Sequence, residues 1–191
     1  MCSCCGLPAL PGKTGLCSDC KNQPPFFKAL RSWCIYQGPA REAIHRLKYS
    51  RDVGLGEVLA RYLIRLTPTL PWQVDLVTCV PLSSKRLKQR GYNQASLLAR
   101  PVALALRAPY RPDLLLRNRD TLSQVDLSAQ ERRQNVAGAF SPAEKFPKGA
   151  SILVIDDVTT TGSTQNACAQ ALLEAGASAV YGLTLARAVL S

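Results

Sequence analysis

Two kinds of apolar pattern alternate along this 191-residue chain. In some segments the apolar residues form unbroken runs, and in others they recur every three or four residues, as in a helix. The unbroken runs predict strands at 31–36, 74–80, 151–155 and about 179–186. The run at 151–155 is mostly β-branched and shows no alternation, which is typical of a central parallel strand covered on both faces.

Helical spacing predicts helices at 40–49, 55–66, 93–107 and about 163–175. Pro101 lies inside the third helix and predicts a kink or break there, whereas Gly176 ends the fourth. The stretch 117–140 is polar and predicts only one short helix, near 128–135. Because strands and helices alternate, the sequence predicts an α/β fold with a mostly parallel sheet flanked by helices.

The first 25 residues depart from this pattern. They are rich in Cys, Gly and Pro, and they have no periodic apolar positions. A segment this small cannot bury enough surface to fold without a staple. We therefore divide the chain into a cysteine module at 1–27 and an α/β domain at 28–191.

Composition narrows the class of protein. Hydrophobic residues make up 47% of the chain, which excludes a disordered polar tail. No apolar run is long enough to span a membrane, and the N-terminus lacks the apolar core of a secretory signal. We therefore expect a soluble, cytoplasmic protein without membrane insertion, and its formal net charge is +11.

Clustered cysteines in a reducing cytoplasm indicate metal binding before disulfides. The module holds two Cys-x-x-Cys pairs separated by eleven residues: Cys2 with Cys5, and Cys17 with Cys20. Four thiolates around one tetrahedral ion predict a structural Zn²⁺ in a small ribbon or knuckle. An iron–sulfur cluster and a metal-free redox site are the alternatives.

The other cysteines lack this spacing. Cys4 directly precedes Cys5, and because neighbouring residues rarely bind one ion well, we interpret Cys4 as a spare thiol. The remaining three are typical of small buried core residues: Cys34, Cys79 and Cys168. We expect the single histidine, His45, to be an ordinary helix residue rather than a catalyst.

The strongest chemical signal follows the strand at 152–155. The strand delivers two adjacent carboxylates, Asp156 and Asp157, to the sheet edge where ligands of parallel sheets bind. A turn of small hydroxyl residues and one glycine then leads into a helix, whose N–H groups and dipole suit a phosphate monoester. The turn contains no lysine to reach a second phosphate, as a nucleoside-triphosphate loop would need.

Successive strand residues point in opposite directions, so Asp156 and Asp157 need not compete for one proton. At least one of them can accept hydrogen bonds from a sugar diol. The alternative interpretation is a helix N-cap after a strand, with acids that only complement the helix dipole.

This segment resembles the phosphoribosyl-pyrophosphate signature of type I phosphoribosyltransferases. Further stretches narrow the resemblance to the ComF family of competence and DNA-utilisation proteins and, with the cysteine pairs, extend it over nearly the whole chain. These stretches are Leu47-Lys48-Tyr49, Val80-Pro81-Leu82, Arg90-Gly91-Tyr92-Asn93-Gln94, and a spaced set of Arg119, Thr121, Gln124, Leu127, Ser128, Arg132, Asn135, Val136, Ala139 and Phe140. Relatives in the family often have a longer cysteine-bearing N-terminus.

The resemblance implies how a phosphoribosyl ligand would be bound. Asp156 and Asp157 would contact the ribose hydroxyls. The 5′-phosphate would be bound by Val158, Thr159, Thr160, Thr161, Gly162, Ser163 and Thr164. Mg²⁺ would bridge pyrophosphate and ribose oxygens, and the segment 82–86 would match the pyrophosphate loop.

The resemblance also implies a reaction. Lys85, Arg86 and Arg119 would stabilise the leaving pyrophosphate. A mobile hood at about 117–136 would close over the ligand and exclude water. The base-recognition residues of these enzymes vary widely, so the acceptor base is not predicted.

A basic patch favours a second class of ligand. Four cations lie within six residues: Lys85, Arg86, Lys88 and Arg90. With Tyr92 and Tyr110, the patch could follow the backbone of single-stranded DNA and stack its bases, although a solvated basic face is the alternative. The sequence thus leaves three hypotheses: a Mg²⁺-dependent phosphoribosyltransferase, a DNA-handling competence factor working with DNA-uptake proteins, and a ligand sensor without turnover.

Overall fold

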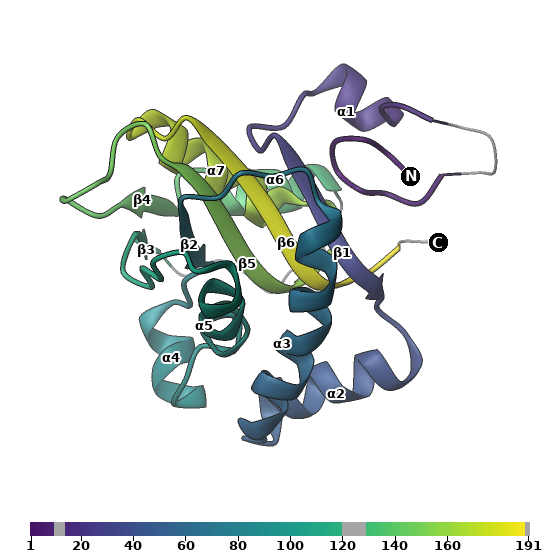
Figure 1. The fold of residues 1–191 in the computed structure, drawn as a ribbon, viewed down its shortest axis with the longest axis vertical. Coiled ribbons are helices and arrows are strands. Elements are labelled where there is room, and N and C mark those ends of the chain that lie inside the picture. The colour runs from purple at the N-terminus through teal and green to yellow at the C-terminus, as the bar shows by residue number, and fades with distance from the viewer. Residues whose placement is uncertain (10–13, 120–128, 190–191) are drawn as a thin grey trace.

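The computed structural model describes residues 1–191 except 10–13, 120–128 and 190–191. Its main sheet has four parallel strands in the order β1-β6-β5-β2 (Figure 1). They are β1 (Ala29–Ile35), β2 (Leu76–Cys79), β5 (Ser151–Thr159) and β6 (Ala179–Arg187). Each overlaps a predicted strand, and β5 lies inside the sheet, as its unbroken apolar run predicts.

Helices cover both faces of the sheet, so the predicted α/β architecture is confirmed (Figure 1). One face carries α2 (Gly38–Tyr49), α3 (Gly54–Leu66) and α5 (Gln94–Leu106), and the other carries α6 (Ala129–Val136) and α7 (Ser163–Glu174). Pro101 lies inside α5 without ending it, so the helix is not broken there.

The side chains of β5 alternate between two apolar cores. Ile152 and Val154 pack in the core that includes α7, whereas Leu153 packs in the core that includes α3 and α5. By the same alternation, Asp156 belongs to the α7 face and Asp157 to the opposite face. The two carboxylates therefore point in opposite directions, as predicted.

Several short elements were not predicted. These are α1 (Ser18–Asn22), the 3₁₀ helix η1 (Thr67–Thr69), α4 (Ser84–Arg90), and an antiparallel pair formed by β3 (Leu115–Arg117) and β4 (Phe140–Pro142). Helix α4 has no apolar period, but its caps mark it. The Ser83 hydroxyl accepts a hydrogen bond from the Arg86 N–H at 3.4 Å, and Gly91 ends the helix at a φ of 84°.

The N-terminal cysteine module is joined to the sheet. The Leu30 N–H donates to the Cys4 carbonyl at 2.8 Å, and the Arg31 guanidinium donates to the Ser3 carbonyl at 2.7 Å. The module also shares an apolar core with Phe27 and with the α7 face. Within the described residues, no helix is both long and apolar enough to cross a bilayer.

Candidate functional site

The carboxyl end of β5 brings two carboxylates together with a lysine. Asp157 is 3% exposed, and its Oδ2 lies 3.0 Å from the Nζ of Lys48 on α2. Both carboxylates are also held by the backbone, because the Asp157 N–H donates to Asp156 Oδ1 at 2.8 Å and the Val158 N–H donates to Asp157 Oδ1 at 2.7 Å. The pair is therefore fixed in place before any ligand arrives.

The pKa values of Asp156 and Lys48 are shifted from their ordinary ranges. Burial raises the pKa of Asp156 to about 8, and the charge of Asp157 adds to this rise while Lys48 opposes it. Burial alone would lower the pKa of Lys48, but the two carboxylates outweigh it and raise that pKa. The carboxylates thus interact although they point apart, which corrects the expectation that they need not compete for a proton.

Lys48 is a site residue that the sequence analysis did not assign. Its only signal was its place in the matched stretch 47–49. In the structure this stretch contacts a second matched stretch, 90–94. The Tyr92 hydroxyl donates to the Leu47 carbonyl, and the Arg90 guanidinium lies 5.4 Å from the centre of the Tyr49 ring. Residues of 47–49 and 90–94 thus form one wall of the site.

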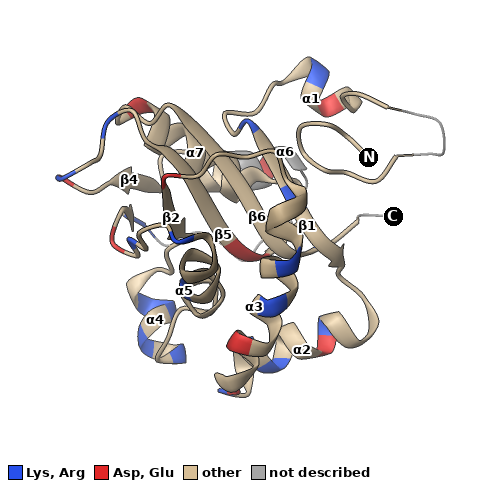
Figure 2. Cartoon of the chain, viewed as in Figure 1, with Lys and Arg blue, Asp and Glu red and all other residues tan. Residues whose placement is uncertain are grey.

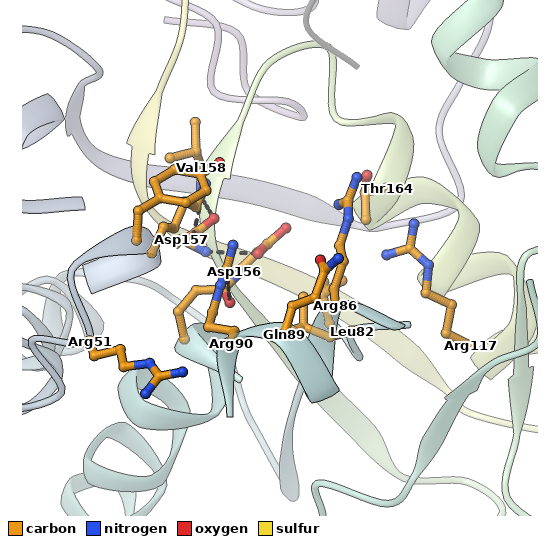
Figure 3. A pocket seen from close by; sticks show the side chains of 14 residues that line it. Arg51, Leu82, Arg86, Gln89, Arg90, Arg117, Asp156, Asp157, Val158 and Thr164 are labelled. Carbon is orange, nitrogen blue, oxygen red and sulfur yellow. Dashed lines mark hydrogen bonds and ion pairs between the residues drawn. The ribbon is translucent and has the colours of Figure 1, made fainter. Parts of the chain in front are cut away.

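A cavity of about 430 Å³ opens at this wall. Five cations line it: Lys48, Arg51, Arg86, Arg90 and Arg117. Figure 3 shows Asp156 and Asp157 near the middle, with Arg86, Arg117 and Thr164 on one side and Arg51 on the other. Apart from Asp156 and Asp157, no acidic residue lines the cavity in the described part of the chain. Its walls therefore favour an anion with several charges.

The residues 159–164, which we call the phosphate loop, follow directly. A second cavity of about 50 Å³ is lined by Asp156, Val158, Thr159, Thr160, Gly162, Ser163, Thr164 and Gln165. Gly162 adopts a φ of 85° and precedes α7, whose first N–H groups are free of helical partners. Thr161 does not line this cavity, and its Oγ1 lies 2.6 Å from the Ser163 Oγ. The loop thus combines backbone donors, hydroxyls and a helix N-terminus at one point.

Of the three cations expected to stabilise a leaving group, one lines the main cavity and two do not. Arg86 lines the main cavity, but Lys85 is exposed and does not. Arg119 is also exposed, and its guanidinium donates to the Ala137 carbonyl at 2.8 Å, while Arg117 lines the cavity instead. The segment 82–86, matched to a pyrophosphate loop, is helical from Ser84 onward. Residues 120–128 of the predicted hood lie outside the described residues.

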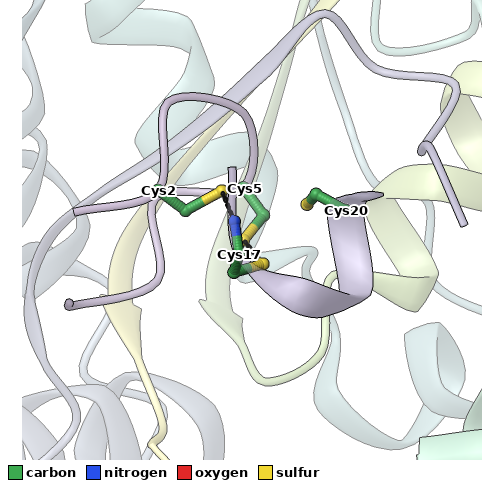
Figure 4. Close-up of side chains that lie close together, drawn as sticks. All are labelled: Cys2, Cys5, Cys17 and Cys20. Atoms are coloured by element: carbon green, nitrogen blue, oxygen red, sulfur yellow. Dashed lines mark hydrogen bonds between the residues drawn. The ribbon is translucent and has the colours of Figure 1, made fainter. Parts of the chain in front are cut away.

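The four module cysteines lie close together (Figure 4). Their sulfur atoms all lie within 4.8 Å of one another, and the Sγ atoms of Cys5 and Cys17 are 3.7 Å apart. A tetrahedral ion with metal–sulfur bonds of about 2.3 Å needs sulfurs about 3.8 Å apart, so the cluster fits a metal such as zinc. Cys4 is outside the cluster, as predicted.

One cysteine is already favoured as a thiolate. Burial opposes ionisation, but backbone N–H groups, led by that of Cys17, lower the pKa of Cys2 to about 6. The Cys17 N–H lies 3.3 Å from the Cys2 sulfur. N–H donors to sulfur are suited to a coordinated thiolate, which carries the charge they stabilise.

Two of the other cysteines are core residues, as predicted. Cys79 is 1% exposed and Cys168 is 0% exposed, whereas Cys34 is half-buried. His45 is exposed, lies 4.7 Å from the Tyr49 ring centre to centre, and does not line either cavity.

Comparison with known proteins gives two kinds of match. The chain is 37% identical over 194 residues to the DNA utilization protein YhgH of Salmonella typhi, covering 98% of this chain and 84% of that protein. It is 34% identical over 180 residues to Competence protein F of Haemophilus influenzae, covering 90% of this chain and 78% of that protein. No protein-family model matches the chain.

Among solved structures, the chain resembles the glutamine phosphoribosylpyrophosphate amidotransferase from B. subtilis, complexed with ADP and GMP. The match covers 74% of this chain with a TM-score of 0.50 and 23% identity. It spans only 30% of the amidotransferase chain, so it shows a shared fold and nothing of that enzyme's activity.

Proposed function

This chain belongs to the ComF family of competence and DNA-utilisation proteins and has a type I phosphoribosyltransferase fold, and we propose that its cavity binds phosphoribosyl pyrophosphate or a related ribose 5-phosphate ligand. One observation carries the proposal. A single cavity joins the start of the α7 helix at Thr164, the carboxylates of Asp156 and Asp157, and an arc of arginines.

Each part of this ligand has a matching surface. The 5′-phosphate meets the N–H groups and hydroxyls of the phosphate loop, at the positive end of the α7 dipole. The ribose hydroxyls meet the carboxylate oxygens of Asp156 and Asp157. The pyrophosphate faces the arginine side chains, which suit its several negative charges.

The same surfaces support a transfer reaction. Pyrophosphate leaves C1 of the ribose with the bonding electrons, and an acceptor base forms the new bond to the resulting oxocarbenium-like carbon. Arg86 and Arg117 stabilise the charge that develops on the leaving group. Lys48 holds Asp157 in place, so the ribose meets an ordered carboxylate.

Two metals belong to the proposal. The carboxylate oxygens of Asp156 and Asp157 are donors that Mg²⁺ prefers, and bound Mg²⁺ supplies charge neutralisation for pyrophosphate. We propose zinc for the four module cysteines, supported by their sulfur atoms, which all lie within 4.8 Å of one another. We also propose a cytoplasmic location and DNA-uptake proteins as partners; the relatives' names, which refer to competence and DNA utilization, support only a role connected with DNA.

Calorimetry with phosphoribosyl pyrophosphate and Mg²⁺ tests the binding. We expect wild type to bind and Asp156→Asn to bind about 10- to 100-fold more weakly, because an oxygen that can accept a hydrogen bond from a ribose hydroxyl is replaced by an amide N–H donor. Asp113→Asn is the matched control, since that aspartate pairs with Arg111 at 3.0 Å and does not line the cavity. Absence of binding by wild type would contradict the proposal.

Turnover is a separate question from binding. With the ligand bound, release of pyrophosphate is measured on addition of each member of a nucleobase panel. Release with any base supports a transferase. Binding without release with every base supports a ligand sensor instead.

A second candidate function is supported by the charge of α4. Figure 2 shows the cations gathered along this helix, and Lys85 and Lys88 are exposed on it outside the cavity. Such a surface could follow single-stranded DNA through its phosphates. We expect DNA affinity to fall with salt, and the log–log slope to decrease by about one for each lysine replaced by alanine. A flat slope in wild type would contradict this candidate.

A further inference from the structure

Arg187, the last residue of β6, is a buried cation. It is 2% exposed, although arginine is almost never fully buried without a partner. It pairs in register with Thr159, so its side chain starts at the sheet edge that carries the phosphate loop. The sequence analysis assigned no role to it.

The guanidinium of Arg187 joins two separate parts of the molecule. One nitrogen, Nη1, donates to the Thr160 carbonyl in the phosphate loop at 2.8 Å. The other, Nη2, donates to the carbonyl of Cys5, which belongs to the cysteine cluster and lies 182 residues away along the chain. One rigid, planar side chain therefore fixes the distance between the metal site and the phosphate loop.

The charge of Arg187 is a second reason to connect it with the cysteine cluster. None of the ion pairs within the described residues includes Arg187, and its two acceptors are neutral carbonyls. A buried cation without an anion nearby is costly. The four cysteine sulfurs lie close enough for their charge to act on Arg187 once they are ionised, and four thiolates with one divalent ion would carry a net charge of −2. The loaded metal site supplies the missing negative charge.

Backbone hydrogen bonds and packing also connect the cysteine module with the phosphate loop. The Ala188 N–H donates to the Thr159 carbonyl at 2.8 Å, just beyond Arg187. Leu30, whose N–H donates to Cys4, packs behind the loop, because a Cβ on Gly162 would lie 3.4 Å from its Cδ2. The module and the loop therefore cannot shift independently without breaking these contacts.

We propose that Arg187 is a positioning residue that links the metal site to the phosphate loop, so that ribose phosphate binds more tightly when the four cysteines hold their metal. The inference rests on the proposed function, because it names how the same site is ordered. Linkage makes the effect reciprocal, so bound ligand also raises the affinity of the four cysteines for the metal.

The first test measures affinity for phosphoribosyl pyrophosphate with Mg²⁺ in the metal-loaded protein. Wild type is compared with Arg187→Met and with Arg31→Met. Arg31 is the matched control, since its guanidinium also donates to module carbonyls, those of Ser3 and Cys4, but not to the phosphate loop. We expect Arg187→Met to bind about tenfold more weakly and Arg31→Met to bind like wild type. Equal affinity in wild type and Arg187→Met would overturn the proposal.

The second test measures the reciprocal effect without any turnover. A metallochromic chelator competes at equilibrium for the metal of each protein, with and without phosphoribosyl pyrophosphate. In wild type we expect the ligand to raise the metal affinity at least fivefold, within the usual range of coupling between sites. In Arg187→Met the ratio of the two metal affinities should fall to about one. An unchanged metal affinity in wild type would overturn the link.

A third measurement separates this inference from the proposed function. If wild type binds no phosphoribosyl pyrophosphate, the proposed function fails, but amide hydrogen exchange still tests the link. We expect the amides of the phosphate loop to exchange faster in wild type once the metal is removed. No change would overturn the link itself. If Arg187→Met does not fold, Arg187→Lys replaces it, because lysine keeps the charge and loses the fork that reaches both carbonyls.

Discussion

Among the individual residues of the site, Lys48 and Asp157 form an ion pair. Asp157 is almost fully buried, and Lys48 retains one-fifth of its side-chain exposure, so their ion pair is shielded from water. Neither residue type is unusual in its own stretch of sequence. They matter to the site because the fold brings them together: Lys48 lies on α2 and Asp157 on β5, and Nζ and Oδ2 are 3.0 Å apart.

Replacing Lys48 with methionine is predicted to destabilise the protein by about 3 kcal/mol, because it leaves an uncompensated buried carboxylate. Chemical denaturation at neutral pH measures the change. The pKa of Lys48 is raised in the folded state, so the contribution of the pair is complete below the ordinary lysine pKa of 10.5 and is lost as pH rises through the higher folded pKa. Arg46→Gln is the control, since its pair with Asp52 is largely exposed and should contribute less than about 1 kcal/mol.

The raised pKa of Asp156 predicts a pH dependence of the same sign as that of Lys48, but at lower pH. Its pKa rises from 3.8 to about 8 on folding, so between these values the folded state binds more protons than the unfolded state. The free energy of unfolding should therefore decrease as pH rises from 4 to 8. Comparing denaturation curves of wild type and Asp156→Asn isolates this contribution. A slope that persists unchanged in Asp156→Asn would contradict the assignment.

At the scale of elements, the junction between β5 and α7 organises the ligand site. The strand ends at Thr159, Gly162 turns the chain with a positive φ, and α7 begins at Ser163. The turn is packed from behind, since Leu30 and Phe27 lie within 4 Å of the position a Cβ would take on Gly162. Any shift of this turn would move the helix N-terminus away from the position proposed for the 5′-phosphate.

Gly162→Ala is predicted to cost about 1 kcal/mol of stability and to weaken binding of phosphoribosyl pyrophosphate. The cost comes from the φ of 85°, and the weaker binding comes from displacement of the loop. Gly149→Ala is the control, because its φ is 79° but a Cβ there meets nothing within 4 Å. Both variants should lose similar stability by thermal denaturation. Loss of ligand affinity in both alike would argue against a specific role for the loop.

At the scale of the whole molecule, the cysteine module is part of the main core. Cys2, Cys5 and Cys20 share an apolar cluster with Phe27, Leu30 and the α7 face of the sheet. A metal bound here therefore stabilises more than its own loop, because folding and metal binding are coupled. Removing it should lower the midpoint of global unfolding.

Cys20→Ser is predicted to lose the bound metal and to unfold at lower temperature than wild type, since one of four ligands is removed. Metal content by elemental analysis and thermal unfolding measure the two effects. Cys4→Ser should keep the metal, because Cys4 lies outside the four-sulfur cluster. Metal loss from Cys4→Ser but not from Cys20→Ser would mean that the ligands are wrongly assigned.

The predictions from sequence succeeded where local pattern was enough. The apolar run before Asp156 predicted β5 and its central place, and the spacing of the cysteines predicted their cluster. Helix α4 was missed because Leu87 is its single apolar residue, so it shows no apolar periodicity, although Ser83 and Gly91 cap it. The direction of the Thr161 hydroxyl was not predictable, because it depends on the tight turn, which places its Oγ1 2.6 Å from the Ser163 Oγ.

What the sequence determined by itself was the strands of the main sheet and most of the helices that cover it, the turn between β5 and α7, and the set of four cysteines. These features depend on neighbours within a few residues, so local chemistry specifies them. Only the tertiary structure decided that Lys48 neutralises Asp157, that Arg117 rather than Arg119 lines the cavity, and that Arg187 joins Cys5 to Thr160. Each of these contacts joins segments that are distant in the chain, and packing of the sheet alone brings them within reach of one another.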